Sequence, residues 1–123
     1  MKSRQSQHAF LFTIFHRLSQ YWNLTEKEQL DLLNVKSAEI LSDFEIGRKV
    51  PPEELFRTIG YLWNIYISLR TLLPDEHSAN TWIRRKNYAK LFSGKPAIEI
   101  MLSGSDGIKK VRDYLLGEIG GPF

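Results

Sequence analysis

The chain has 123 residues, of which 42% are hydrophobic and 25% are charged, and its formal net charge is +3 at pH 7. This is the composition of an ordinary globular protein, and the length suffices for a core without disulfide or metal staples. The lack of cysteine excludes disulfides, thiolate metal sites and cysteine nucleophiles. No apolar run approaches the roughly 18 residues of a membrane span, and the first residues lack a signal peptide's apolar region. We therefore expect a cytoplasmic protein that does not interact with membranes.

Charge is distributed unevenly along the chain. Residues 1–22 contain three bases and no acid, residues 23–46 two bases against six acids, and residues 47–90 eight bases against four acids. A basic, acidic, basic order in so short a chain indicates separate charged surfaces rather than one uniform field.

The first predicted element is an amphipathic helix from His8 to Trp22. Its apolar residues recur at steps of three and four, which is the spacing of one helical face. The polar face carries few cations, so packing in the core is favoured over binding to a membrane surface. The residues expected to form the apolar stripe are Phe10, Leu11, Ile14, Phe15, Leu18, Tyr21 and Trp22.

Two short helices joined by a tight turn are predicted next. Thr25 and Glu28 have the spacing of a capping box, in which each side chain accepts a hydrogen bond from the other residue's amide. Asn34 tolerates the left-handed conformation that ends such a helix. Ser37 can cap a third helix, which ends at Gly47. The order of short helix, turn and short helix is that of a helix-turn-helix, a pattern that many helical corners share.

The charge of the second short helix disfavours contact with DNA. The helix exposes Glu39, Asp43 and Glu45, whereas affinity for DNA comes mainly from lysine and arginine at the phosphates. Two interpretations stay open, specific DNA binding and a corner retained for packing or dimerisation. The residues expected to contact DNA in the first case are Lys36, Ser37, Ser42, Arg48 and Lys49.

A long central helix is predicted to begin at Pro51-Pro52 and to end at Pro74. Proline fits the first turn, and the two glutamates that follow favour the positive end of the helix dipole. Gly60 costs about 1 kcal/mol relative to alanine, which predicts a closely packed neighbour. Two apolar stripes are expected to pack on flanking helices or on the same helix of a second copy in a homodimer. They are Leu55, Ile59, Leu62, Tyr66, Leu69 and Leu73, and beside them Phe56, Trp63 and Ile67.

The remaining segment alternates short helices with rigid turns. Asp75 can cap a helix, and Gly94 with Pro96 predicts a turn into a further short helix. A break at residues 103–107 precedes the last amphipathic helix. The inner stripe expected for that helix is Ile108, Val111, Leu115 and Ile119.

A basic cluster interrupts this segment. As a nucleic-acid patch it is modest, and a solvated face is the better interpretation. Its members are Arg84, Arg85 and Lys86, with Lys90 and Lys95 following.

No set of residues suited to catalysis emerges. His8, His16 and His77 stand apart, without the spacing of metal ligands. The serines and the aspartate of the break at residues 103–107 have no accompanying base, so capping explains them better than a nucleophile does. We expect no enzymatic activity, no metal and no cofactor.

The C-terminal segment contains a spaced set of residues that is typical of a known family. The set has a tryptophan, an asparagine, a turn with glycine and proline, a second glycine, and a helix with spaced valine and leucine. Its members are Trp82, Asn87, Gly94, Pro96, Gly107, Val111, Leu115 and Gly120. With these residues in the pattern of the toxin-binding region, residues 25–121 resemble the MbcA/ParS/Xre-type antitoxins of bacterial toxin–antitoxin pairs. Lys86 stands where that family usually has proline.

The predicted elements and the resemblance together give an all-α fold in two parts. Residues 1–73 form a helix-turn-helix-like bundle with the long central helix, and residues 74–123 form a small helical toxin-binding region.

The function that the resemblance implies is neutralisation of a cognate toxin, commonly a RES-domain enzyme that consumes NAD. Family members cover the toxin's active site with their C-terminal region, and many repress their own operon as dimers. Phe123 and the terminal carboxylate are expected to enter the toxin's cleft. The residues expected to bind the toxin are Trp82, Asn87, Phe92, Gly94, Pro96, Tyr114, Glu118 and Phe123.

Two other functions stay open beside this one. The first is a helix-turn-helix repressor of operator DNA without a toxin partner. The second is a structural or polar-targeting adaptor.

Overall fold

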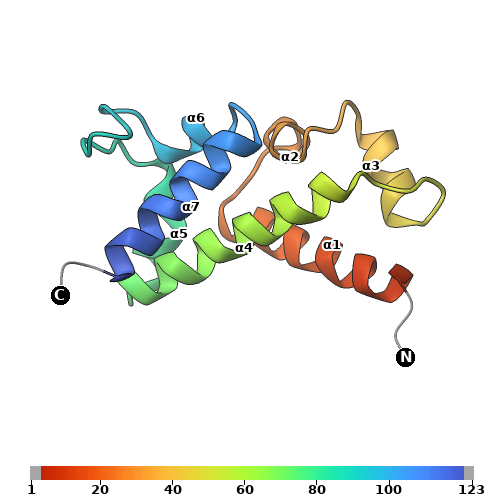
Figure 1. The fold of residues 1–123 in the computed structure, drawn as a ribbon, viewed down its shortest axis with the longest axis horizontal. Helices are drawn as coiled ribbons and strands as arrows, with labels where there is room; N and C mark the ends of the chain where they lie inside the picture. The colour runs from red at the N-terminus through yellow and green to blue at the C-terminus, as the bar shows by residue number, and fades with distance from the viewer. Residues whose placement is uncertain (1–3, 121–123) are drawn as a thin grey trace.

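A computed structural model describes residues 4–120, with side chains from residue 8 onward, and within that range the fold is all-helical (Figure 1). The predicted all-α class is therefore confirmed. The elements are α1 (Arg4–Tyr21), α2 (Glu26–Leu33), α3 (Ala38–Glu45), α4 (Glu53–Leu72), α5 (Glu76–Thr81), the 3-10 helix η1 (Trp82–Arg84), α6 (Ala97–Met101) and α7 (Ser105–Gly120).

The predicted helix boundaries follow from local capping. Glu28 donates its amide to the Thr25 hydroxyl at 3.1 Å, and Thr25 donates its amide to the Glu28 carboxylate at 2.9 Å, which completes the capping box of α2. Asn34 ends that helix in the left-handed region with φ of 55°. Ser37 caps α3 and Asp75 caps α5, each through a hydrogen bond from the amide three residues later.

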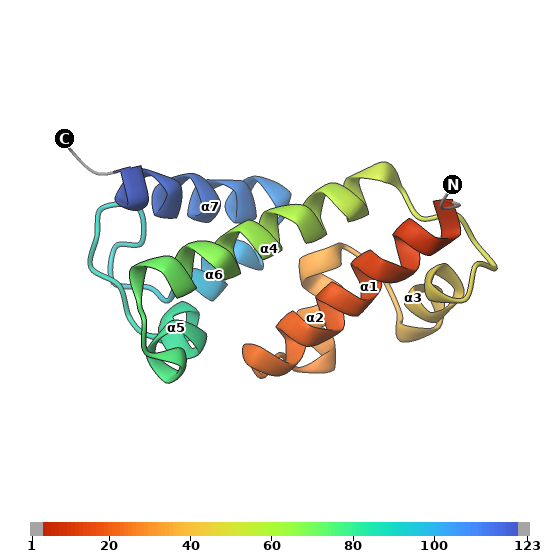
Figure 2. The same ribbon diagram turned by 90° about the horizontal axis from the view of Figure 1, so that it is seen from below.

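The central helix α4 lies between α1 and α7 (Figures 1 and 2). Its inner stripe is buried inside the single chain, at Leu55, Ile59, Leu62 and Leu69. The helices α4 and α7 run parallel, because Ser105 bonds Glu54 near their starts and Arg112 stacks on Tyr61 further along. The leucine seam is thus covered by helices of the same chain.

Two residues expected to face inward are exposed instead, so those predictions were wrong. Phe10 is 64% exposed and Ile119 is 40% exposed. Phe12, which also belongs to α1, is buried in the protein core. Phe10 is two residues away and therefore lies on the opposite face of the helix. The second stripe of α4 is only half covered, since Trp63 and Ile67 are both exposed.

The prediction of close packing at Gly60 was also wrong within this chain, because a Cβ there would meet no atom within 4 Å. The close approach occurs at Gly107 instead. A Cβ at Gly107 would lie 2.0 Å from the Ile100 carbonyl oxygen and 2.6 Å from the Ser103 hydroxyl. Gly107 therefore lets α7 pack directly on the α6–α7 turn.

Arg84 ties the two halves of the chain together. Its guanidinium donates to the Trp22 and Asn23 carbonyls at 2.9–3.1 Å and to both carboxylate oxygens of Glu28 at 2.8 and 3.1 Å. These carbonyls are at the C-terminal end of α1, where a cation is favoured by the helix dipole. Arg85 donates to the Ser78 carbonyl at 2.7 Å. Two members of the basic cluster are therefore structural.

None of the helices described between residues 4 and 120 combines the length and the apolarity needed to cross a membrane.

Candidate functional site

The loop between η1 and α6 is closed by backbone hydrogen bonds. An isolated antiparallel bridge joins Lys86 and Pro96, and the Asn87 amide donates to the Lys95 carbonyl at 3.3 Å. The Gly94 amide donates to the Asn87 carbonyl at 2.7 Å. The two ends of the loop are thus held side by side, which fixes the residues between them.

The predicted residues of this loop shape its backbone. The Asn87 side chain accepts a hydrogen bond from the Ala89 amide at 2.9 Å, a local bond that starts the turn. Gly94 has φ of 87°, which lies in the region that favours glycine, and Ser93 has φ of 50°. Pro96 has φ of −64° and begins α6. These three predicted site residues determine the form of the loop.

A row of three aromatic rings joins the loop to the neighbouring helices. Phe92 contacts Trp82 of η1 edge-on at 5.7 Å between ring centroids, and it contacts Tyr114 of α7 in the same manner at 5.1 Å. Phe92 is only 1% exposed, whereas Trp82 and Tyr114 are half-buried. Phe92 therefore positions the other two rings and offers no surface of its own.

The outer face of α7 continues this site toward the end of the helix. Burial, and secondarily the negative charge of Glu118, raise the pKa of Tyr114, so its hydroxyl is a neutral hydrogen-bond donor at physiological pH. Glu118 is exposed, as are the apolar side chains Leu116 and Ile119. Phe123 lies outside the described residues.

The loop and the last turn of α7 lie at one end of the molecule, and α3 lies at the other (Figures 1 and 2). The predicted DNA contacts are on the α2–α3 turn, on α3 and on the segment after it. Ser37 is engaged as the cap of α3. Arg48 and Lys49 each lie 3.8 Å from Asp43. Lys36 and Ser42 are exposed.

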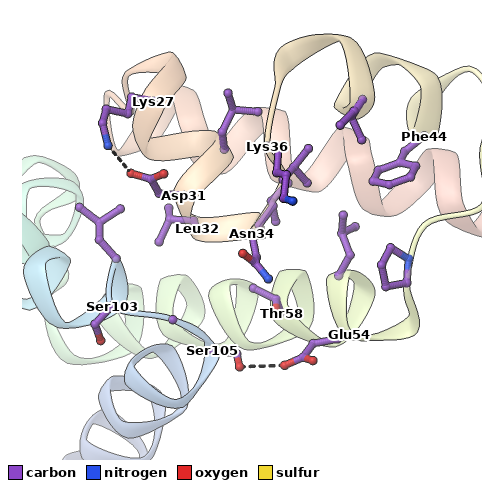
Figure 3. Close-up of a pocket in the computed structure, with 18 of the residues that line it drawn as sticks. Lys27, Asp31, Leu32, Asn34, Lys36, Phe44, Glu54, Thr58, Ser103 and Ser105 are labelled. Carbon is purple, nitrogen blue, oxygen red and sulfur yellow. Dashed lines mark hydrogen bonds and ion pairs between the residues drawn. The ribbon is translucent and has the colours of Figure 1, made fainter.

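A groove of about 1010 Å³ separates the α2–α3 turn, the start of α4 and the α6–α7 turn (Figure 3). Asn34, Lys36 and Thr58 line it, and the Ser105 hydroxyl donates to Glu54 at 2.8 Å on its far side. Three segments that are distant in sequence form this groove, and no pattern in the sequence predicts it. Of the predicted site residues that the structure describes, only Lys36 lines it.

Tyr88 is a highly exposed residue of this loop that was not among the predicted site residues. Its side chain is 80% exposed and lies against Gly94, next to the hydrogen-bonded base of the loop. The available signal was an aromatic residue flanked by lysines in a stretch without any acid.

Comparison with known proteins gives two matches. Residues 68–121 match the family model described as the antitoxin Xre/MbcA/ParS C-terminal toxin-binding domain. The matched segment begins inside α4, so it includes the end of the central helix as well as the loop and α7. The chain is also 30% identical over 108 residues to the uncharacterized protein y4oB of Sinorhizobium fredii, over 87% of this chain and 82% of that protein. No solved structure matches the chain.

Proposed function

The chain belongs to the Xre/MbcA/ParS antitoxin family through its C-terminal toxin-binding domain, and on that premise we propose that it neutralises a RES-type, NAD-consuming toxin by covering the toxin's active site. The proposal is supported by one observation, which is that the residues matched by the family model contain the candidate site. The matched residues 68–121 include the loop of residues 85–96 and the exposed face of α7, which lie together at one end of the molecule.

The exposed side chains at this end suit a protein interface. Leu116 and Ile119 provide exposed apolar area on one side of α7, and Tyr114 and Glu118, one turn apart, provide a hydrogen-bond donor and a charge on another side of the same helix. Apolar contacts surrounded by polar groups are typical of protein interfaces. The buried Phe92 holds Tyr114 in place, so part of this surface is ordered before the toxin binds.

We propose that Phe123 covers the toxin's active site. This residue lies beyond the described residues, and its aromatic ring would occupy the pocket that binds a base of the toxin's substrate. The chain itself acts by binding and carries out no catalysis.

Deletion of residues 117–123 tests the proposed neutralisation. The deletion leaves the buried Val111 and Leu115 in place, so the fold should survive with an unchanged circular dichroism spectrum. In cells that co-express the toxin, we expect growth to stop with the truncated chain and to continue with the full chain. The matched control carries Lys36→Ala, Arg48→Ala and Lys49→Ala at the other end of the molecule and should still protect. Protection by the truncated chain would contradict a role for this segment.

Autorepression through operator DNA is a separate proposal. Lys36 is exposed on the α2–α3 turn, but Asp43 partly neutralises Arg48 and Lys49, and Glu39 is exposed on α3. Binding of the chain to its own upstream DNA should then weaken steeply as salt rises, and the triple alanine variant should not bind.

A homodimer through α4 is also proposed, but its contact surface differs from the leucine stripe that the sequence suggested. The leucine seam is buried within one chain, so the second copy would contact the exposed Trp63 and Ile67. Sedimentation of the wild type and of Trp63→Ala measures this directly, because the substitution should shift the chain to monomer.

A further inference from the structure

The loop presents an exposed aromatic side chain next to its hydrogen-bonded base. Tyr88 is 80% exposed, and a Cβ at Gly94 would lie 3.4 Å from its ring carbon Cε1, so the ring lies against the Gly94 backbone. The residues on either side of Tyr88 are fixed, since the Ala89 amide bonds the Asn87 side chain and Gly94 bonds the Asn87 carbonyl. A large exposed ring on a rigid turn can bind a partner at a low cost in conformational entropy.

The charged residues near Tyr88 in the sequence are all basic. Residues 77–98 contain five Lys and Arg residues and no Asp or Glu. Arg84 and Arg85 are engaged by the Glu28 carboxylate and by backbone carbonyls. The three lysines of the loop are exposed and make no ion pair with any carboxylate in the described part of the chain. They are Lys86, Lys90 and Lys95.

The loop packs against α7. Phe92, four residues after Tyr88, packs edge-on against Tyr114, so the loop and the outer face of α7 are held by one buried ring. Both lie at the same end of the molecule, opposite α3 (Figures 1 and 2). A partner that binds the end of α7 can therefore reach Tyr88 as well.

We propose that Tyr88 and the lysines at positions 86, 90 and 95 form a second contact surface, which binds an acidic patch on the toxin beside the region that meets α7. This inference rests on the proposed function and specifies the chemistry of the partner. Charge complementarity identifies the patch. Three exposed cations, with no carboxylate partner among the described residues, share a short loop with an exposed aromatic side chain, so the opposing surface carries carboxylates beside an apolar or aromatic depression.

The test measures the affinity of the purified chain for the RES-type toxin of the proposed function, by calorimetry at about 0.05 M and 0.3 M salt. We expect Tyr88→Ala to weaken binding by at least about tenfold. The triple variant Lys86→Glu, Lys90→Glu, Lys95→Glu should weaken it by more than about a hundredfold at low salt, and the loss should shrink at high salt because screening weakens the charge contacts.

Matched controls lie at the opposite end of the molecule. Phe10→Ala removes another highly exposed aromatic ring, and Lys36→Glu, Arg48→Glu, Lys49→Glu reverses three other exposed cations. Both should bind like the wild type, as should the triple lysine-to-arginine variant of the loop. Unchanged circular dichroism and melting temperature establish that each variant folds.

The possible outcomes separate the two proposals. If the wild type does not bind this toxin, both the proposed function and the loop contact are contradicted. If the wild type binds and the loop variants keep its affinity and salt dependence, only the loop contact is overturned. Equal losses in the loop variants and in the matched controls would also overturn it, since they would indicate a general effect of net charge.

Discussion

Gly107→Ala should lower the free energy of unfolding by about 3 kcal/mol, which is at the upper end of the usual cost of overpacking. The added Cβ would lie 2.0 Å from the Ile100 carbonyl oxygen, and this oxygen belongs to backbone that cannot move aside like a flexible side chain. Relief would require α7 to move away from the α6–α7 turn and would open the core around Ile108 and Met101, both of which are fully buried. Urea unfolding measures the change.

Gly60→Ala is the matched control for this substitution. Gly60 is also helical, but a Cβ there meets no atom within 4 Å. The substitution should therefore stabilise the chain by up to about 1 kcal/mol, because alanine has the higher helix propensity. If Gly107→Ala unfolded at the urea concentration of the wild type, the close packing of α7 on the turn would be contradicted.

Arg84→Ala should lower the free energy of unfolding by about 2 kcal/mol, after allowance for the partial exposure of the pair. The substitution removes the donors to the Trp22 and Asn23 carbonyls and leaves the Glu28 carboxylate without its cation. Arg85→Ala is the matched control, since it loses a hydrogen bond to one carbonyl, that of Ser78, and should cost less than about 1 kcal/mol. Equal losses in the two variants would contradict the role of Arg84 as the tie between the halves.

The pH dependence of stability provides a second readout for Arg84. Its hydrogen bonds to the Glu28 carboxylate lower the pKa of that group below 4.5, with smaller help from the bonds to Thr25. A carboxyl whose pKa is lowered in the folded state adds stability above its unfolded pKa and loses it as the pH falls through the folded pKa. We therefore expect the wild type to lose more stability than Arg84→Ala as the pH is taken below about 4.5. Parallel pH profiles would contradict this linkage.

Local signals in the sequence predicted the helix boundaries well. Thr25 with Glu28, Asn34 and Asp75 act through bonds to residues within four positions, so the sequence contains all the information that these caps need. The turn at Gly94 and Pro96 was predictable because glycine favours a positive φ and proline fixes its own φ. The central stripe of α4 was also predictable, because helical spacing alone places its residues on one face.

Packing between distant segments was less predictable. Phe10 and Ile119 have the spacing of core residues, but whether a helix face is covered depends on which helix lies next to it. Gly60 and Gly107 both lie in predicted helices, and nothing in the sequence distinguishes them. Only the path of the α6–α7 turn makes glycine sterically necessary at position 107 and not at position 60.

The sequence predicted the segment of the toxin-binding domain but only part of what its residues do in the fold. All but one of the predicted toxin-binding residues fall within the matched range 68–121, yet Asn87, Gly94 and Pro96 shape the backbone, and Phe92 is buried. Arg84 is part of a run of bases that indicates a solvated face, but its partners lie more than fifty residues away. Tyr88 was missed because its exposure follows from the loop geometry and not from its neighbours in sequence.

Hydrogen–deuterium exchange of the chain with and without its toxin tests most directly where the toxin binds. The proposed function predicts slower exchange in the loop at residues 86–95 and in the last turns of α7 at residues 114–120 when the toxin is present. It predicts no change in α3, which lies at the opposite end of the molecule. Slower exchange confined to residues 26–45, with none at the loop or α7, would contradict it.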